Sequence, residues 1–359
     1  MAEDQNSQDE SKEDEVLFDK IRPPEKEKTR PEPSRNLYRE DVSHDADKLS
    51  EAVIVEVQPK GCFAHTFDAD GLRSDTRIWL SVRKSLKGKK QKAKNIIAVG
   101  DRVLFEPQDG DEGVVEVVKD RKTKLSRPAT RGQDRIEHVL VANADQLAVV
   151  SAVRQPELRP GLVDRYLVAA RHNNMTGMVV INKIDLDPGV EVATYAAIYE
   201  RAGCQVFCTN ALTGQGVPRL RAAIEGRTTV FCGHSGVGKS ALLNIIVPGA
   251  NIKVGEVPEK YMKGRHTTNN AVLYHIEGNT RVIDTPGVRE FGLWGVNKED
   301  IDNYYPEIRD LKHNCRFSTC GHDKEPDCAV TAALAAGEIH PERMASYRRI
   351  KETLGRDYS

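Results

Sequence analysis

Residues 233–240 of this 359-residue chain carry the clearest chemical signal in the sequence. They match the pattern G-x-x-x-x-G-K-[S/T]; the residues before them (229–231) predict a strand and those after them (241–246) a helix. Glycines in such a loop let backbone N–H groups turn toward phosphate oxygens, and the helix N-terminus adds partial positive charge. We predict a phosphate site formed by Gly233, His234, Ser235, Gly236, Val237, Gly238, Lys239 and Ser240, with Lys239 on the β- and γ-phosphates and Ser240 on Mg²⁺.

A second motif, Asn182, Lys183, Ile184 and Asp185, follows a predicted strand at 177–181. A carboxylate in this place accepts hydrogen bonds from guanine N1 and the exocyclic amine, whereas adenine presents the opposite pattern. The lysine stem would pack on the base. Asn210 and Ala211 follow the next predicted strand, where GTPases carry a loop behind the base, although serine is more usual than asparagine there. These residues together predict specificity for guanine.

A D-x-x-G motif at 284–287 ends another predicted strand. We expect Asp284 to hold Mg²⁺ through water and the Gly287 N–H to contact the γ-phosphate. In the polar loop 264–268, one of the two threonines, Thr267 or Thr268, would complete the Mg²⁺ shell, and we favour Thr268. All five elements of a guanine-nucleotide site are therefore present.

The glutamine that orients the attacking water in many GTPases would directly follow Gly287, and Val288 occupies that position. We therefore predict slow intrinsic hydrolysis, with a partner or another residue supplying the missing group. His266 is a candidate for this role, and it fits equally well as a residue that only shapes its loop. The predicted catalytic set is accordingly Lys239, Thr268 and His266.

A late cysteine cluster has the spacing Cys-x₄-Cys-x-His-x₅-Cys. Three thiols and one imidazole within fourteen residues make a closed tetrahedral Zn²⁺ set, which predicts a structural ion that helps a small domain to fold. The predicted ligands are Cys315, Cys320, His322 and Cys328. The other four cysteines lie in strand patterns and are interpreted as core residues.

Composition favours a soluble chain, with 30% charged and 39% hydrophobic residues. No apolar segment approaches the roughly 18 residues of a membrane span, and the N-terminus lacks a signal-peptide pattern. We therefore predict a cytoplasmic protein with no membrane partner. The net charge of −1 hides an asymmetry: residues 1–20 hold eight acidic residues and two lysines, giving −6 and leaving +5 for the rest. A weakly basic body is compatible with a nucleic-acid partner.

The elements that must position these motifs begin after a polar, proline-containing tail at 1–48, which we predict to be disordered. Five short apolar alternations, at 53–57, 62–67, 77–82, 101–106 and 113–118, predict a small β-barrel, with the OB-fold the best candidate. Between two of these strands, residues 83–94 hold seven basic residues and no acidic one. Such a loop fits contact with an RNA backbone, and it also fits a solvated flexible loop.

Residues 120–135 are polar and basic and are interpreted as a linker. Strands then alternate with helices at 162–172, 192–202 and 217–224, which predicts a parallel sheet covered on both faces, with ligands at its carboxyl edge. The base-reading motifs precede the phosphate loop, so the domain is circularly permuted. Two more helices are predicted at 329–339 and 342–354; the second is basic and could face RNA or only solvent.

The predicted fold class is thus multi-domain: a β-barrel, an α/β circularly permuted P-loop GTPase and a small α-rich zinc domain. The predicted boundaries are a disordered acidic tail at 1–48, an OB-fold RNA-binding domain at 49–122, a GTPase domain at 136–293 and a zinc-binding domain at 294–359.

These motifs in this order resemble the ribosome-small-subunit-dependent GTPase A family, and the match covers roughly residues 50–355. The resemblance implies an OB-fold, then a permuted GTPase, then a zinc domain. It further implies a monomeric bacterial assembly factor that hydrolyses GTP to GDP, acts late in maturation of the 30S subunit, contacts 16S rRNA and is stimulated by the small subunit. Val288 fits this family, which lacks the glutamine.

Three other functions remain as alternatives. A nucleotide-gated RNA-binding module with negligible turnover is compatible with Val288. An ATP-dependent enzyme is opposed by Asp185. A permuted GTPase of the large ribosomal subunit is disfavoured only through the resemblance, which pairs the barrel and zinc domain with the small subunit.

Overall fold

The computed structural model describes residues 49–67, 73–83, 86, 94–131, 134–187, 189–250, 252, 271–285 and 291–356. The predicted acidic tail at 1–48 lies outside these residues, as does most of the basic loop at 83–94. Within the described residues, no helix has the length and apolar character needed to cross a membrane.

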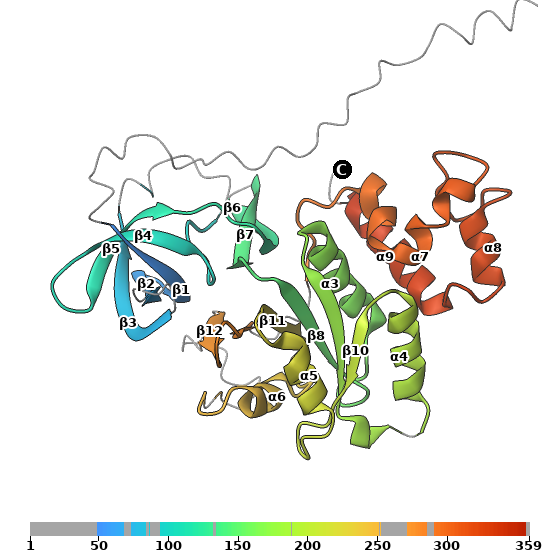
Figure 1. Ribbon diagram of the computed structural model, residues 1–359. Helices are drawn as coiled ribbons and strands as arrows, with labels where there is room; N and C mark the ends of the chain where they lie inside the picture. Colours follow the sequence, from blue (N-terminus) through green and yellow to red (C-terminus); the bar gives the residue numbers. More distant parts are fainter. Residues whose placement is uncertain are drawn as a thin grey trace, which may run out of the picture. The chain divides into compact units, whose positions relative to one another are not determined.

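The first described strands close into a five-stranded barrel (Figure 1). They are β1 (Ser50–Gln58), β2 (Gly61–Phe67), β3 (Arg73–Val82), β4 (Arg102–Pro107) and β5 (Glu112–Val118). Paired strands run antiparallel except β3 and β5, which are parallel, and β4 closes the ring on β1. Alternate side chains point inward, so Ile54, Leu80 and Val103 are fully buried. The predicted barrel is confirmed, with all five of its strands.

A two-stranded ribbon follows the barrel: β6 (Lys124–Arg131) pairs antiparallel with β7 (Asp134–Ala142). The prediction of a linker at 120–135 is wrong for most of its length. The many basic residues obscure a strand pattern in which Leu125, Val139 and Val141 are buried. The Asn95 side chain holds the ribbon at Val139, because it donates to that carbonyl at 2.8 Å and accepts from that N–H at 3.1 Å.

The central sheet has the order β10-β9-β8-β11-β13-β12. Its strands are β8 (Gln146–Ala152), β9 (Thr176–Asn182), β10 (Gln205–Cys208), β11 (Thr228–Gly233), β12 (Val272–His275) and β13 (Arg281–Asp284). Neighbours are parallel except β12, which runs antiparallel to β13. Strand β12 also pairs with β1, Val272 opposite Glu56, so the sheet continues into the barrel. The carboxyl ends of the parallel strands share one edge, where ligands bind in such sheets.

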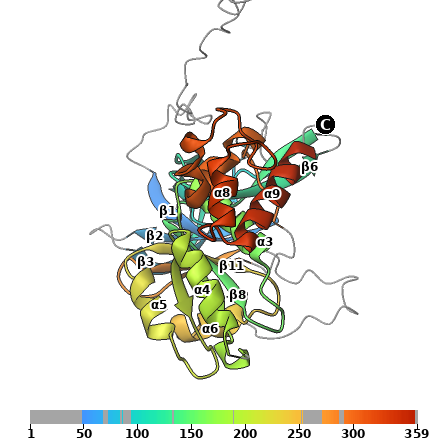
Figure 2. The same ribbon diagram turned by 90° about the vertical axis from the view of Figure 1, so that its right-hand side faces the viewer.

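Helices cover both faces of this sheet, as predicted. Helices α3 (Pro160–His172) and α4 (Glu191–Arg201) lie on one face, and α5 (Val217–Ile224) and α6 (Lys239–Ile246) lie on the other (Figure 2). Strand β8 is buried along its whole length. Because successive residues face opposite sides, Val149 joins the cluster that contains Tyr166 of α3, and Val150 joins the one that contains Leu242 of α6.

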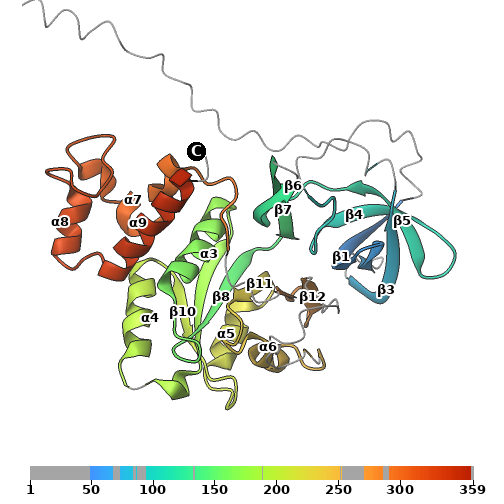
Figure 3. The ribbon, with the colours of Figure 1, turned by 180° about the vertical axis from the view of Figure 1, so that it is seen from behind.

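The C-terminal region consists of four short helices and the longer helix α9, which packs on α3. Its elements are η5 (Lys298–Tyr304), α7 (Pro306–Arg309), η6 (Lys312–Asn314), α8 (Ala329–Ala335) and α9 (Pro341–Arg356). Helix α9 lies beside α3 (Figure 3). Arg343 of α9 is only 3% exposed; it contacts Asp164 of α3 and lies 2.7 Å from Glu307 of α7. Both predicted C-terminal helices are present, although the first ends at Ala335 rather than at residue 339.

Candidate nucleotide-binding site and metal centre

Strand β11 brings the glycine-rich loop to the carboxyl edge of the sheet, and α6 begins directly after it at Lys239. Gly236 and Gly238 have φ angles of +84° and +87°, a region that other residues rarely adopt. A Cβ atom on Gly238 would also lie 2.4 Å from Asn182 Nδ2. The loop therefore needs glycine at position 238 both for its backbone angle and for the close approach of Asn182.

The phosphate-loop lysine lies against the end of β13. Strands β11 and β13 are parallel neighbours, with Phe231 opposite Asp284, and Lys239 Nζ contacts Asp284 Oδ1. Burial raises the pKa of the Asp284 carboxyl, and the Lys239 ammonium opposes that increase. Ser240 is half-buried at the second position of α6. A buried cation and a carboxylate thus meet at a helix N-terminus, an arrangement suited to a triphosphate and its divalent cation.

Asn182, at the end of β9, connects the phosphate loop to the predicted base loop. Its side-chain Nδ2 donates to the Val237 carbonyl at 2.9 Å, and its Oδ1 accepts from Thr209 Oγ1 at 3.1 Å and from the Ala211 N–H at 3.2 Å. The residue is 1% exposed. Because Asn182 is buried and makes all three contacts, they fix the spacing between the two loops that would bind the base and the phosphates.

The next residues of the motif face outward from this connection. Lys183 adopts a left-handed backbone with φ of +59°, and its Nζ donates to the Gln155 carbonyl at 2.5 Å. Ile184 and Asp185 lie in the short helix η3 (Ile184–Leu186), and the Asp185 side chain is exposed. The Asp185 carboxylate is therefore accessible to a base, and the Lys183 side chain is held in place through its ammonium group.

Asn210 shapes the loop after β10. Its Oδ1 accepts from the N–H groups of Leu212 and Thr213, at 2.8 and 3.3 Å, and its backbone bridges to Gln215. The Asn210 side chain therefore stabilises the turn that follows it, a role that a serine hydroxyl can also perform.

Three predicted site residues lie outside the described part of the chain: His266, Thr268 and Gly287. Val288 and Thr267 also lie outside it. The other predicted nucleotide residues lie at the ends of β9, β11 and β13, at the start of α6, or in the segments that directly follow β9, β10 and β11.

Two contributors were absent from the sequence prediction. Thr209 donates to Asn182, and its position directly before Asn210 was the available signal. Gln155 contributes only its backbone carbonyl oxygen, so its side chain gives no signal in the sequence. Its segment, which follows β8, lies against the phosphate loop, with Pro156 close to Gly236.

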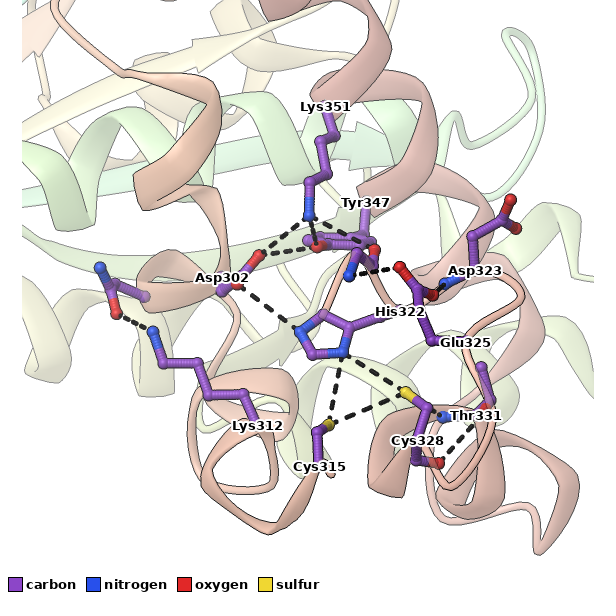
Figure 4. A network of polar contacts seen from close by, with 12 residues as sticks. Asp302, Lys312, Cys315, His322, Asp323, Glu325, Cys328, Thr331, Tyr347 and Lys351 are labelled. Atoms are coloured by element: carbon purple, nitrogen blue, oxygen red, sulfur yellow. Dashed lines mark hydrogen bonds and ion pairs between the residues drawn. The ribbon is translucent and has the colours of Figure 1, made fainter. Parts of the chain in front are cut away.

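The predicted metal ligands converge at the other candidate site. Cys315, Cys320, His322 and Cys328 place one ligand atom each within 4.8 Å of all the others. The Sγ atoms of Cys315 and Cys328 are 3.8 Å apart, and His322 Nδ1 lies 3.6 and 3.5 Å from them (Figure 4). Tetrahedral zinc with bonds of about 2.3 Å separates two sulfurs by about 3.8 Å, so the donor set fits a zinc ion.

The surroundings of this cluster favour a bound cation. Burial opposes ionisation of the Cys328 thiol, but hydrogen bonds from the Thr331 N–H and from His322 lower its pKa. His322 Nε2 faces Asp302 Oδ2 at 3.6 Å. Sequence reasoning did not identify Asp302, which comes from η5 and lies outside the cysteine-containing segment.

Comparisons with known proteins agree with this arrangement. The RsgA GTPase family matches residues 118–294. The small ribosomal subunit biogenesis GTPase RsgA of Chlorobaculum tepidum is 40% identical over 267 residues, which cover 72% of this chain and 86% of that protein. The protein of the same name from Azotobacter vinelandii is 41% identical over 261 residues, covering 72% of this chain and 75% of that protein.

Two solved structures are similar to most of this chain. YjeQ from Thermotoga maritima matches with a TM-score of 0.66 and 31% identity, covering 85% of this chain and 98% of that one. YloQ, described as a circularly permuted GTPase, matches with a TM-score of 0.63 and 27% identity, covering 88% of this chain and 99% of that one.

Proposed function

This chain belongs to the RsgA GTPase family and is a GTPase, and we propose that it acts in late maturation of the 30S ribosomal subunit. In this proposal the protein is a monomer in the cytoplasm, and it contacts 16S rRNA. The names of the relatives in Chlorobaculum tepidum and Azotobacter vinelandii support a role in small-subunit biogenesis. The observation that best supports a guanine-nucleotide switch in this chain is the Asn182 connection between the phosphate loop and the base loop.

Guanine recognition is assigned to Asp185, whose exposed carboxylate would accept from N1 and the exocyclic amine. Lys183 would pack its stem on the base, because its ammonium is held at Gln155. Asn182, Ile184, Asn210 and Ala211 would support this loop from behind. A site of this kind disfavours adenine, since adenine does not offer the carboxylate the two donors that guanine does.

Phosphate binding is assigned to residues 233–240. Lys239 would move from Asp284 to the β- and γ-phosphates, because a multiply charged anion attracts the ammonium more strongly than one carboxylate does. Ser240, Asp284 and Thr268 would hold Mg²⁺, which neutralises negative charge on the phosphates. The Gly287 N–H would contact the γ-phosphate.

We assign activation of the water that attacks GTP to the complex of this protein with the ribosome. Val288 offers no polar group at the usual glutamine position, so we propose slow intrinsic hydrolysis that the small subunit stimulates. His266 is the candidate from this chain for orienting the water.

The domain assignment follows the predicted boundaries: an acidic tail at 1–48, a barrel at 49–122 that contacts RNA, a GTPase domain at 136–293 and a zinc domain at 294–359. In the last of these, Cys315, Cys320, His322 and Cys328 would hold one structural zinc ion. A closed set of four protein ligands leaves no open position for substrate, so the metal would stabilise the domain rather than react.

Co-sedimentation tests the proposed partner. The full-length protein is mixed with purified 30S or 50S subunits in the presence of GDP or a non-hydrolysable GTP analogue. We expect pelleting with 30S that is strongest with the analogue. Equal pelleting with 50S would contradict the assignment to the small subunit. A second candidate function is an RNA-binding module with negligible turnover, which is compatible with Val288 at the usual glutamine position. Pelleting that depends on the nucleotide, without single-turnover GTP hydrolysis on the 30S subunit, would support this second function.

A further inference from the structure

We propose that Asp302 is a positioning residue for the metal centre, and that it couples this centre to the GTPase domain through η5. Its carboxylate would orient His322 so that Nδ1 faces the three thiols. The inference rests on the proposed zinc site and goes beyond it, because it names a residue from outside the ligand segment and a mechanical consequence of metal binding.

The imidazole of His322 has its two nitrogens facing different partners. Nδ1 lies 3.5 and 3.6 Å from the sulfurs of Cys328 and Cys315, whereas Nε2 lies 3.6 Å from Asp302 Oδ2 (Figure 4). Metal binding at Nδ1 requires a lone pair there, so the proton must sit on Nε2. Among the described residues, buried Nε2 has no hydrogen-bond partner at ordinary distance. A shift of a few tenths of an ångström would give it the Asp302 carboxylate.

Asp302 is itself held in place from α9. Tyr347 donates its hydroxyl to Asp302 Oδ1 at 2.6 Å, and Lys351 Nζ lies 3.5 Å from the same oxygen and 2.6 Å from the tyrosine hydroxyl. The Asp302 side chain is only 14% exposed. Its second oxygen, Oδ2, is therefore left to face His322. A carboxylate fixed in this way sets both the tautomer and the ring orientation of a metal-binding histidine.

The acidic residues of the ligand segment itself have other partners. The Glu325 carboxylate accepts from the N–H groups of Gly321, Asp323 and Lys324, so it shapes the loop between ligands. Asp323 is 61% exposed and lies 3.4 Å from Arg348. Asp327 lies 3.0 Å from Arg316, so among these four carboxylates Asp302 is the one that faces the metal-binding histidine.

The same short helix connects the centre to α3. Tyr304 follows Asp302 by two residues; its hydroxyl lies 2.8 Å from His172 Nδ1, and its carbonyl accepts from Arg171 Nη1 at 2.7 Å. Both partners belong to the last turn of α3, which covers the nucleotide-binding sheet. Loss of the metal should therefore release His322, then Asp302, and then loosen the contact between η5 and α3.

Zinc affinity of the full-length protein tests the positioning role. The affinity is measured by competition with a chromophoric chelator, for the wild type, Asp302→Asn and the control Asp300→Asn, which lies in the same helix and pairs with Asn297 instead. We expect Asp302→Asn to weaken binding by roughly 10- to 100-fold and the control to match the wild type. The visible spectrum of the Co²⁺-loaded variant, with circular dichroism in excess zinc, shows whether the variant is folded with all four ligands.

The outcomes distinguish failure of the zinc site from failure of the role of Asp302. A wild type that does not bind zinc would overturn the metal site itself. A wild type that binds tightly, with Asp302→Asn within about twofold of it, would overturn the role of Asp302 and leave the metal site standing.

Hydrogen–deuterium exchange tests the coupling. Removal of zinc from the wild type should increase exchange in η5 and in the last turn of α3, while α5 on the opposite face of the sheet stays unchanged. Zinc-loaded Asp302→Asn should show part of the same increase. Unchanged exchange in η5 and α3 after zinc removal would overturn the coupling.

Discussion

Asn182 Nδ2 donates to the backbone carbonyl of Val237 at 2.9 Å, and this bond joins two loops that are 55 residues apart in the sequence. The order of these loops is permuted, with Asn182 first. Their contact nevertheless depends only on β9 and β11 ending at the same edge of the sheet, with β8 between them. The geometry of a guanine-nucleotide site is therefore independent of where the chain begins.

Replacing Asn182 should damage both stability and nucleotide binding. The variant Asn182→Ala leaves the Val237 carbonyl, the Thr209 hydroxyl and the Ala211 N–H without their buried partner. We expect the free energy of unfolding to fall by about 2 kcal/mol or more and GDP affinity to fall at least tenfold. Urea denaturation and fluorescent-nucleotide titration measure these effects. Asn173→Ala, which removes a contact at the end of α3, serves as control and should retain GDP affinity.

Replacing Asp185 should change nucleotide choice without affecting the fold. Its exposed side chain contributes little to stability, and Asp185→Asn replaces one acceptor oxygen with an NH₂ donor. We expect GTP affinity to fall by about 100-fold or more and affinity for xanthosine triphosphate, which has a carbonyl in place of the exocyclic amine, to rise. Competition binding with the two nucleotides measures the switch. Unchanged preference for GTP would remove Asp185 from the base site.

Replacing Arg343 should destabilise the junction between α3 and the C-terminal helices. Arg343→Met leaves the carboxylates of Asp164 and Glu307 buried without their cation, and breaking a buried pair in this way costs about 3–5 kcal/mol. Urea denaturation measures the loss. The exposed Arg349 on the same helix is the matched control, and Arg349→Met should change stability by no more than about 0.5 kcal/mol. Equal effects of the two variants would show that the buried ion pair contributes nothing particular.

The β6–β7 ribbon should lose stability in mild acid because of His138. Burial, together with the nearby charges of Lys94 and Arg127, lowers the pKa of His138 to about 4, whereas an unfolded histidine titrates near 6.5. Between these values the unfolded state binds more protons, so stability falls as the pH decreases from about 6.5 to about 4. His138→Gln should flatten this dependence in urea denaturation, and the exposed His313→Gln should not. A pH profile that is identical in wild type and His138→Gln would contradict the assignment.

Much of the nucleotide site could be predicted because its residues follow strands directly. Gly233 and Asn182 each end a strand just after a short apolar run, and the shared carboxyl edge of a parallel sheet then places them together. The cluster that could hold a metal was equally predictable, since its four residues lie within fourteen positions of the sequence.

Other features depend on contacts that no local pattern carries. Asp302 reaches His322 across twenty residues that include all of α7 and η6, and nothing in its own neighbourhood distinguishes it from Asp300. The linker predicted at 120–135 contains strand β6, whose basic side chains outnumber the buried Leu125 and so hide the strand pattern. Gln155 acts through its carbonyl oxygen, which every residue possesses.

GTP turnover by the full-length protein, measured with and without purified 30S subunits and with 50S subunits as control, tests the central claim most directly. The account predicts slow turnover alone, strong stimulation by 30S and none by 50S, because Val288 leaves the site without its own water-orienting glutamine. Tight GTP binding with no stimulation by either subunit would contradict it.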